Sequence, residues 1–179
     1  MTPSYPDTRP LLPARLHHAA YVSSDQERAR HFYEDILGMP LTDFWIEREI
    51  LGGVEHVFAL ASYGLADGSS LSFFHFADPD LQARYAAKPQ GLFVHLALKI
   101  APEQQEALRD RLKAAGIPAM EFDHGYARSL YVEDPDGQTL ELCVDPEHHG
   151  DGAKESARDA LTRWLAGDRT PNNHLPRAA

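Results

Sequence analysis

The stretch Leu37-Gly38-Met39-Pro40-Leu41 decides how this chain is organised, because its pattern returns as Ala115-Gly116-Ile117-Pro118-Ala119. In both copies the glycine suits the left-handed backbone that commonly ends a helix. The proline two residues later cannot continue that helix and suits the start of a strand. The sequence therefore predicts a helix before each copy and a strand after it.

The segments around the first copy predict one helix and four strands. Residues 16–22 alternate as a strand does, and Ser24 or Asp25 stands where it can cap a helix that runs to Gly38. Further strands are expected at 41–47, 54–63 and 69–76, separated by the turn residues at 52–53 and 66–68. The predicted order is βαβββ.

The segments around the second copy repeat that order. A strand is expected at 93–99, a helix from Pro102 to Gly116, and strands at 120–122, 129–133 and 139–144. The last two strands are joined by the turn Asp134-Pro135-Asp136-Gly137. Because a repeated unit predicts a fold built from copies, we expect an α+β fold. In it, two βαβββ modules pair into a curved mixed sheet around a metal-binding cleft.

These patterns set the expected boundaries of the chain's parts. Residues 1–13 form a proline-rich irregular arm, residues 14–79 the first module, residues 80–90 a linker and residues 91–146 the second module. Residues 147–179 form a polar tail with a short helix at 159–166, expected to pack Leu161, Trp164 and Leu165 on the body.

Composition excludes several functions. The 179 residues are 43% hydrophobic and 25% charged, which is typical of a globular protein. The formal net charge of -10 offers no basic surface to a nucleic acid. No apolar run has the length of a signal peptide or a membrane span, so we expect a cytoplasmic protein without membrane contact. The single cysteine, Cys143, excludes an internal disulfide and a multi-cysteine zinc site.

Three residues carry the predicted chemistry. His18 and His95 occupy the same place in the first strand of the two repeats, and Glu141 lies in the last strand of the second. A lone histidine in a strand is more often structural, but Glu141 lies between Leu140 and Leu142, where a buried carboxylate needs a strong partner. Two imidazoles and a carboxylate are ligands of mononuclear iron, manganese and zinc sites. We therefore predict one divalent metal ion held by all three.

These residues resemble the vicinal oxygen chelate superfamily, which includes glyoxalases, fosfomycin-resistance transferases, bleomycin-binding proteins and extradiol dioxygenases. The resemblance covers roughly residues 15–146. Its motif residues are His18, Asp25, Phe32-Tyr33, Leu37-Gly38, Asp134-Pro135-Asp136-Gly137 and Glu141. It implies a U-shaped cavity with the metal on His18, His95 and Glu141.

A narrower resemblance is to single-domain type I extradiol dioxygenases. Its signature residues are His124, Leu130-Tyr131, Asp134-Pro135, Gly137 and Glu141, and Phe122 departs from it. It implies Fe(II), O₂ and a catechol-type aromatic substrate, with His124 beside metal-bound oxygen and Tyr131 beside a catecholate hydroxyl. The family's acid-base histidine has no counterpart at 77–87, so His75 is the nearest candidate for proton transfer.

Other activities of the superfamily remain open. A glyoxalase-like lyase or isomerase needs a second Glu, which would fall at Ser72 or Phe74, and a thiol transferase needs more cations than Lys99 and Arg128. A metal-free drug-binding protein is a further alternative. Mn(II), Zn(II) and Ni(II) suit the same ligands as Fe(II). The resemblance also implies a homodimer, in some relatives with modules exchanged between subunits.

Overall fold

The computed structural model describes residues 13–86, 88, 91, 93–145 and 157–172. The chain divides into two compact units, residues 1–88 (unit 1) and residues 89–179 (unit 2). Each unit contains its own four-stranded mixed sheet, which confirms the predicted α+β class and the two βαβββ modules.

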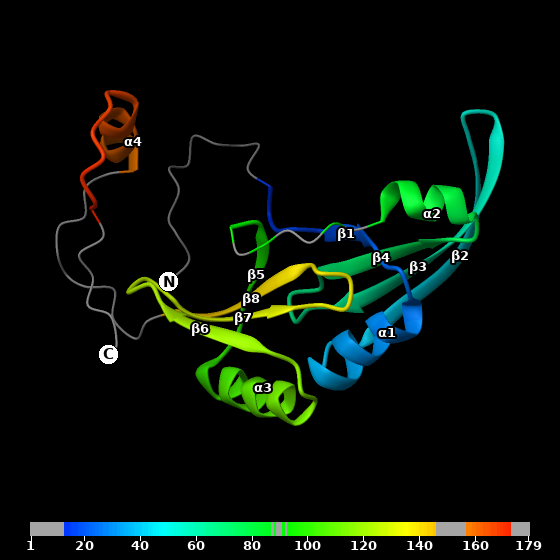
Figure 1. Cartoon of the computed structure of the whole chain (residues 1–179), viewed down its shortest axis with the longest axis horizontal. Helices are drawn as coiled ribbons and strands as arrows, with labels where there is room; N and C mark the ends of the chain where they lie inside the picture. Colours follow the sequence, from blue (N-terminus) through cyan, green and yellow to red (C-terminus); the bar gives the residue numbers. More distant parts are fainter. Residues whose placement is uncertain (1–12, 87, 89–90, 92, 146–156, 173–179) are drawn as a thin grey trace. The chain divides into compact units, whose positions relative to one another are not determined.

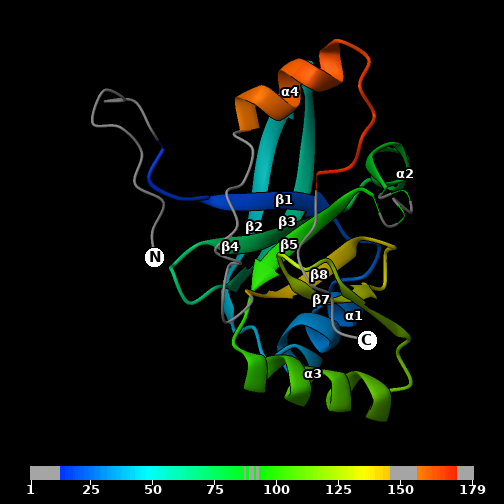
Figure 2. The ribbon, with the colours of Figure 1, turned by 90° about the vertical axis from the view of Figure 1, so that its left-hand side faces the viewer.

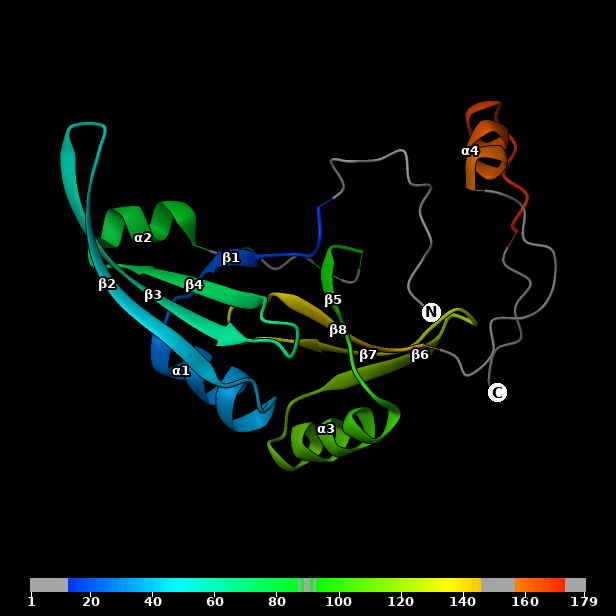
Figure 3. The same cartoon turned by 180° about the vertical axis from the view of Figure 1, so that it is seen from behind.

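Unit 1 forms a sheet in the order β1-β4-β3-β2, in which β1 runs parallel to β4 and the other neighbours are antiparallel. Helices α1 and α2 lie on opposite sides of this sheet (Figure 1; Figure 3). Its elements are β1 His18–Val22, α1 Gln26–Arg30, η1 His31–Ile36, β2 Leu41–Leu51, β3 Val54–Gly64, β4 Ser70–Phe76 and α2 Pro79–Tyr85.

The first helix differs from a regular α-helix in its second half. Asp25 caps it as predicted, because its side chain accepts hydrogen bonds from the backbone N–H groups of Glu27 and Arg28. From His31 to Ile36 the helix widens into a π-helix, which hydrophobic spacing does not reveal.

The pairing register of the strands shows which residues lie on each of the two faces of the unit 1 sheet. On the face toward α1 and η1, Tyr33 stacks on Tyr63 and packs against Phe73, and all three are buried. On the other face, called the His18 face, the strand partners of His18 and Ala20 are Ser70 and Ser72. The residues sharing this face include Ser62, Leu60, Phe58, Phe74, Phe76, Trp45, Asp43, Glu47 and Glu49.

Helix α2 (Pro79–Tyr85) occupies the first half of the segment expected to be a linker, residues 80–90, and begins one residue before it. It begins at Pro79, and the Asp78 side chain accepts from the backbone N–H groups of Asp80 and Leu81. A proline at the first position and an aspartate cap are the ordinary start of a helix, but its short length hid it from hydrophobic periodicity.

Unit 2 repeats the arrangement in the order β5-β8-β7-β6, with β5 parallel to β8. Figure 2 shows α3 along one side of this sheet. Its elements are β5 His95–Lys99, α3 Pro102–Ala114, β6 Ala119–Asp123, β7 Arg128–Glu133, β8 Thr139–Val144 and α4 Ala157–Leu165.

The unit 2 sheet also has two different faces, one apolar and one that carries polar side chains. Leu112 of α3 is fully buried, as are Leu130 and Leu140 of the strands, and the Gln105 side chain donates to the Leu142 carbonyl. The residues that alternate with these leucines form the Glu141 face: His95, Ala97, Lys99, Ser129, Tyr131, Glu133, Thr139, Glu141, Cys143, Met120 and Phe122.

The predicted tail helix is present as α4, but the side chains expected to pack are exposed. Leu161, Trp164 and Leu165 are all more than half exposed, and Arg169 lies over the Trp164 ring. The i, i+3, i+4 spacing predicts an apolar stripe but not what covers it. Among the helices of the described residues, none is long and apolar enough to span a membrane.

Candidate active site

Strand pairing in unit 2 brings three predicted site residues together. Glu141 on β8 pairs with Tyr131 on β7 and with Ala97 on β5, two residues beyond His95. Residues at even spacing on neighbouring strands share a face. The three side chains therefore meet although they are far apart in sequence.

These side chains form a continuous hydrogen-bonded chain. The Tyr131 hydroxyl donates to Glu141 Oε1 at 2.7 Å, and His95 Nε2 lies 2.8 Å from Glu141 Oε2. His124 Nε2 lies 3.1 Å from the Tyr131 hydroxyl and 3.9 Å from Glu141 Oε1. Because the only tyrosine proton is used on the carboxylate, His124 Nε2–H donates to the tyrosine oxygen. The chain therefore runs from His124 through Tyr131 to Glu141.

The Glu141 carboxyl is kept ionised despite its position. Its side chain is only 9% exposed, and burial raises its pKa. Hydrogen bonds from Ser129, Tyr131 and Cys143, together with the charge of His95, outweigh burial and hold the pKa below the usual 4.5. At neutral pH the site therefore presents a buried anion.

The groups around Glu141 stay protonated. Burial, followed by the hydrogen bond to Glu141, raises the pKa of the Tyr131 hydroxyl well above its ordinary range. Burial and the negative charge of Glu141 raise the pKa of the Cys143 thiol to about 11. Tyr131 is therefore a hydrogen-bond donor at neutral pH, and Cys143 is a poor nucleophile.

The His124 ring stacks on two aromatic side chains. Its ring stacks on Phe122 at 6.1 Å and on Tyr126 at 5.4 Å between centroids. The His124 backbone N–H donates to the Ala127 carbonyl across a short loop between β6 and β7. Phe122, the residue that departs from the extradiol signature, thus supports the ring of His124.

The other two predicted residues belong to unit 1. His18 lies at the start of β1, with its Nδ1 2.8 Å from Nδ1 of His17. His75 lies on β4 on the opposite face from His18, and its Nδ1 lies 3.0 Å from the Ser23 carbonyl oxygen. The pairing of β4 is regular, without the bulge that would turn His75 toward His18. Its predicted role in proton transfer stays a prediction.

The donors suit part of a divalent metal site. His95 and Glu141 supply an imidazole nitrogen and an ionised carboxylate oxygen, the types that iron, manganese and zinc accept. In the part of the chain that the structure describes, no three His, Cys, Asp or Glu side chains are grouped around a common metal position. The His18, His95 and Glu141 set therefore stays a prediction.

Sequence reasoning missed Ser129 as part of this site. Ser129 is 2% exposed, its hydroxyl lowers the pKa of Glu141, and its Oγ lies 3.9 Å from Cys143 Sγ. The available signal was its position two residues before Tyr131, which places both side chains on one face of β7.

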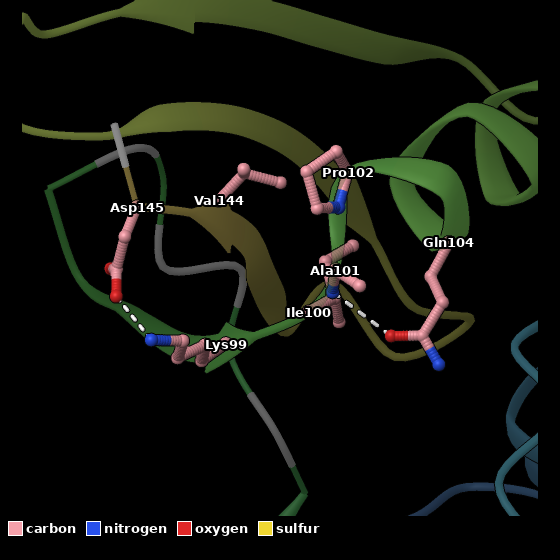
Figure 4. Close-up of a pocket in the computed structure, with 7 residues that line it drawn as sticks. All are labelled: Lys99, Ile100, Ala101, Pro102, Gln104, Val144 and Asp145. Atoms are coloured by element: carbon pink, nitrogen blue, oxygen red, sulfur yellow. Dashed lines mark hydrogen bonds and ion pairs between the residues drawn. The ribbon is translucent and has the colours of Figure 1, made fainter. Parts of the chain in front are cut away.

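A separate pocket lies between the end of β5, the start of α3 and the end of β8, with a volume of about 440 Å³ (Figure 4). Lys99 forms an ion pair with Asp145 at its rim, and the Gln104 side chain accepts from the Ala101 backbone N–H at 2.9 Å. None of the candidate site residues lines this pocket.

Comparison with known proteins finds a matching family model and a curated relative. The family model described as Glyoxalase/Bleomycin resistance protein/Dioxygenase superfamily matches residues 15–142. A curated relative from Serratia marcescens, named glutathione transferase FosA, is 26% identical over 129 residues, covering 72% of this chain and 79% of the relative.

Two solved structures share the fold. A glyoxalase/dioxygenase from Nostoc punctiforme aligns with a TM-score of 0.54 and 23% identity, covering 82% of this chain and 100% of that chain. A variant of the fosfomycin resistance protein FosX from Listeria monocytogenes, complexed with Mn(II) and 1S,2S-dihydroxypropylphosphonic acid, aligns with a TM-score of 0.53 and 16% identity. That alignment covers 84% of this chain and 99% of that one.

Proposed function

The chain belongs to the glyoxalase/bleomycin resistance protein/dioxygenase superfamily, and on that premise we propose that it is an extradiol dioxygenase. In this proposal the protein binds Fe(II) and uses O₂ to cleave the ring of a catechol-type substrate in aromatic compound catabolism. Members of the superfamily include enzymes that bind divalent metals, as FosX binds Mn(II).

The observation that carries the proposal is the chain of His124, Tyr131 and Glu141. Its distances of 3.1 Å and 2.7 Å connect a proton-carrying imidazole to an ionised carboxylate through one phenol. Such an arrangement holds each group in one orientation before a substrate arrives. The two adjacent hydroxyls of a catechol need hydrogen bonds of this kind to hold the ring in one orientation.

We assign the metal to His18, His95 and Glu141. These residues would hold Fe(II), which would supply the Lewis-acid and redox chemistry that a catechol and O₂ need. Glu141 contributes the negative charge, and its ionisation at neutral pH does not require the metal. The proton on His95 Nε2 that now faces Glu141 at 2.8 Å has to leave when the nitrogen becomes a ligand.

The remaining residues bind and move protons. Tyr131 keeps its proton at neutral pH and holds Glu141 in place, and in this proposal its oxygen contacts a hydroxyl of the substrate. His124 is 30% exposed and carries its proton on Nε2, so it acts as the donor or acceptor nearest to Tyr131. Its ring stacks on those of Phe122 and Tyr126.

Charge argues against an anionic substrate. Among the described strand residues of the His18 face there is no Lys or Arg, whereas Asp43, Glu47 and Glu49 lie on it. On the Glu141 face Lys99 is a cation, and it is paired with Asp145. A phosphonate or another dianion would need several cations, so a neutral catechol fits this distribution better.

Two activities of relatives remain as alternatives. Thiol transfer is favoured by the 26% identity to a glutathione transferase, but not by the distribution of charge. A glyoxalase-like lyase needs a second carboxylate, which is missing at the expected place. In unit 1 Ser72 pairs with Ala20, just as in unit 2 Glu141 pairs with Ala97. The residue equivalent to Glu141 in unit 1 is therefore a serine, which is not a base at neutral pH.

Anaerobic loading with Fe(II) followed by a panel of catechols and admission of air tests the proposal. We expect O₂ consumption and a yellow ring-fission product, absent from Glu141→Gln and retained by Tyr126→Phe. Protein that binds Fe(II) but consumes no O₂ with any catechol contradicts the proposal. Loss of glutathione thiol in the presence of fosfomycin would favour the transferase, and failure to take up Fe(II) or Mn(II) would favour a metal-free binding protein.

We also propose a homodimer located in the cytoplasm. Sedimentation velocity of the purified protein distinguishes a dimer from a 20.0 kDa monomer. Mixing His18→Ala with Glu141→Gln protein then tests whether ligands come from two subunits. Recovery of metal binding in the mixture indicates exchanged modules, and its absence in a stable dimer indicates ligands from one chain.

A further inference from the structure

The hairpin formed by β2 and β3 projects past the end of β4, as Figure 1 shows. Pairing between β3 and β4 runs from Phe58 to Gly64, whereas pairing between β2 and β3 continues to Leu51 and Val54. Residues 48–51 and 54–57, called the hairpin extension, therefore form a two-stranded structure. An isolated two-stranded hairpin is only marginally stable in water. The hairpin extension therefore gains stability when another surface covers it.

One face of this hairpin is largely apolar and exposed. Ile46 and Ile50 alternate with the His18-face residues of β2, so they lie on the face that α1 and η1 cover nearer to Tyr63. That cover ends along the strands, because Ala61 is 1% exposed, whereas Ile46 is 75% and Ile50 72% exposed. An exposed apolar group of this size marks an interaction surface. This surface, called the Ile46 face, consists of Phe44, Ile46, Arg48, Ile50, Glu55, Val57 and Ala59.

The Ile46 face carries one positive and one negative charge. Arg48 Nη1 lies 2.7 Å from Glu55 Oε1 on the neighbouring strand, and both side chains are more than half exposed. The other side of β2 differs, because three carboxylates of this strand lie on the His18 face. In a chain with a net charge of -10, two copies repel each other overall. The neutral Ile46 face is a surface on which two copies meet without that repulsion.

The register of the hairpin also makes the Ile46 face complementary to itself. A two-fold axis parallel to the strands places β2 of one copy over β3 of the other. Ile46 pairs with Ala59 within the hairpin, so it then faces the partner's Ala59, a large side chain against a small one. Arg48 and Glu55 are diagonal neighbours within the hairpin, so each Arg48 also becomes a diagonal neighbour of the partner's Glu55.

We propose that the Ile46 face is the surface on which a second copy of this chain binds. The two hairpins pack face to face at about the 10 Å spacing of stacked sheets, and each Arg48 pairs with the partner's Glu55. The inference names the surface of the homodimer put forward with the proposed function, and it rests on that homodimer. At these strand spacings the face is roughly 20 Å long and 10 Å wide, a smaller footprint than the about 800 Å² per partner of a stable complex. The dimer should therefore dissociate on dilution.

Sedimentation velocity at several protein concentrations tests this surface. Ile46→Asp places a charge in the centre of the contact, so we expect the dissociation constant of the dimer to rise at least about tenfold. Val54→Asp is the matched control, because Val54 is 57% exposed on the same hairpin but lies on the opposite face. Urea unfolding checks that both variants are folded. A dimer that is unchanged in Ile46→Asp overturns the inference and leaves the homodimer standing, whereas a wild type that is monomeric at every concentration overturns both.

Exchange of the two charges tests whether the contact joins two copies. Arg48→Glu makes the Ile46 face acidic and Glu55→Arg makes it basic, so each variant alone should dimerise at least about tenfold more weakly. Mixing the two variants places opposite charges at both diagonal contacts and should restore the dimer as a heterodimer, which native mass spectrometry identifies. A statistical mixture of homodimers and heterodimers, expected if the charges lie outside the contact, overturns the inference. A heterodimer in protein that cleaves no catechol supports the inference and contradicts only the proposed catalysis.

Discussion

The Tyr131 hydroxyl donates a 2.7 Å hydrogen bond to the Glu141 carboxylate across neighbouring strands. Both residues are buried, and both lie on the face of unit 2 that is opposite to α3. A short hydrogen bond to an ionised group is among the stronger polar interactions in a protein. This contact joins the predicted metal ligand to the predicted substrate-binding residue.

Tyr131→Phe should weaken both folding and metal binding. The variant leaves a buried carboxylate oxygen without its donor, which costs about 1–3 kcal/mol of unfolding free energy. Loss of a group that orients a ligand typically weakens metal affinity by about tenfold to a hundredfold. Urea unfolding and Mn(II) titration measure the two effects, with Tyr126→Phe as control because that hydroxyl belongs to an exposed side chain. Equal metal affinity in Tyr131→Phe and wild type would show that the hydrogen bond does not position Glu141.

Glu141→Gln should abolish stoichiometric binding of Fe(II) and Mn(II). The amide has nearly the same shape but no charge, and these metals prefer anionic oxygen ligands. His18→Ala and His95→Ala should have the same effect if the three residues form one site. Metal content after gel filtration measures the outcome, and a Glu133→Gln variant controls for loss of a carboxylate elsewhere on the same face. Full metal content in His18→Ala would remove His18 from the ligand set.

The stability of the metal-free protein should depend on the ionisation of Glu141. Its pKa is lower in the folded protein than the ordinary 4.5, so the folded state is favoured by the charged form. This contribution is present above pH 4.5 and is lost as the pH falls through the lowered value. Unfolding by urea at pH 7 and at successively lower pH checks the sign. The difference in unfolding free energy between wild type and Glu141→Gln should shrink on acidification, and a difference that grows would contradict the assignment.

The predicted role of His75 in proton transfer has a specific test. Glutamine retains a donor for the Ser23 carbonyl but cannot exchange a proton at neutral pH. The role predicts that His75→Gln lowers kcat about a hundredfold while KM and metal content stay unchanged. Wild-type kcat in this variant would leave His75 with only its hydrogen bond to Ser23, at the entry to α1.

Two leucines should respond very differently to truncation. Leu112 of α3 is fully buried, so Leu112→Ala should lower the unfolding free energy by about 2–5 kcal/mol. Leu165 of α4 is 76% exposed, so Leu165→Ala should change it by less than about 0.5 kcal/mol. Thermal unfolding measures both. A large effect at Leu165 would show that α4 is covered in solution.

The sequence alone predicted the order of elements and the equivalence of His18 and His95. Glycine and proline act locally, and alternation along a strand needs no knowledge of its neighbours, so the repeat of βαβββ was visible without a structure. Helix α2 and the π-helical turn were not, because segments of six or seven residues are too short to show a periodicity of their own.

Strand register was decided only by the tertiary structure. It joined Glu141 to Tyr131 and His95, added Ser129, and placed His75 on the face away from His18. It also grouped Phe58, Phe74 and Phe76 on the His18 face. Residue types and local spacing state which chemistry a chain carries, but a shift of one residue in pairing reverses the face of every side chain. The partners of a functional residue therefore depend on contacts between strands that are distant in the sequence.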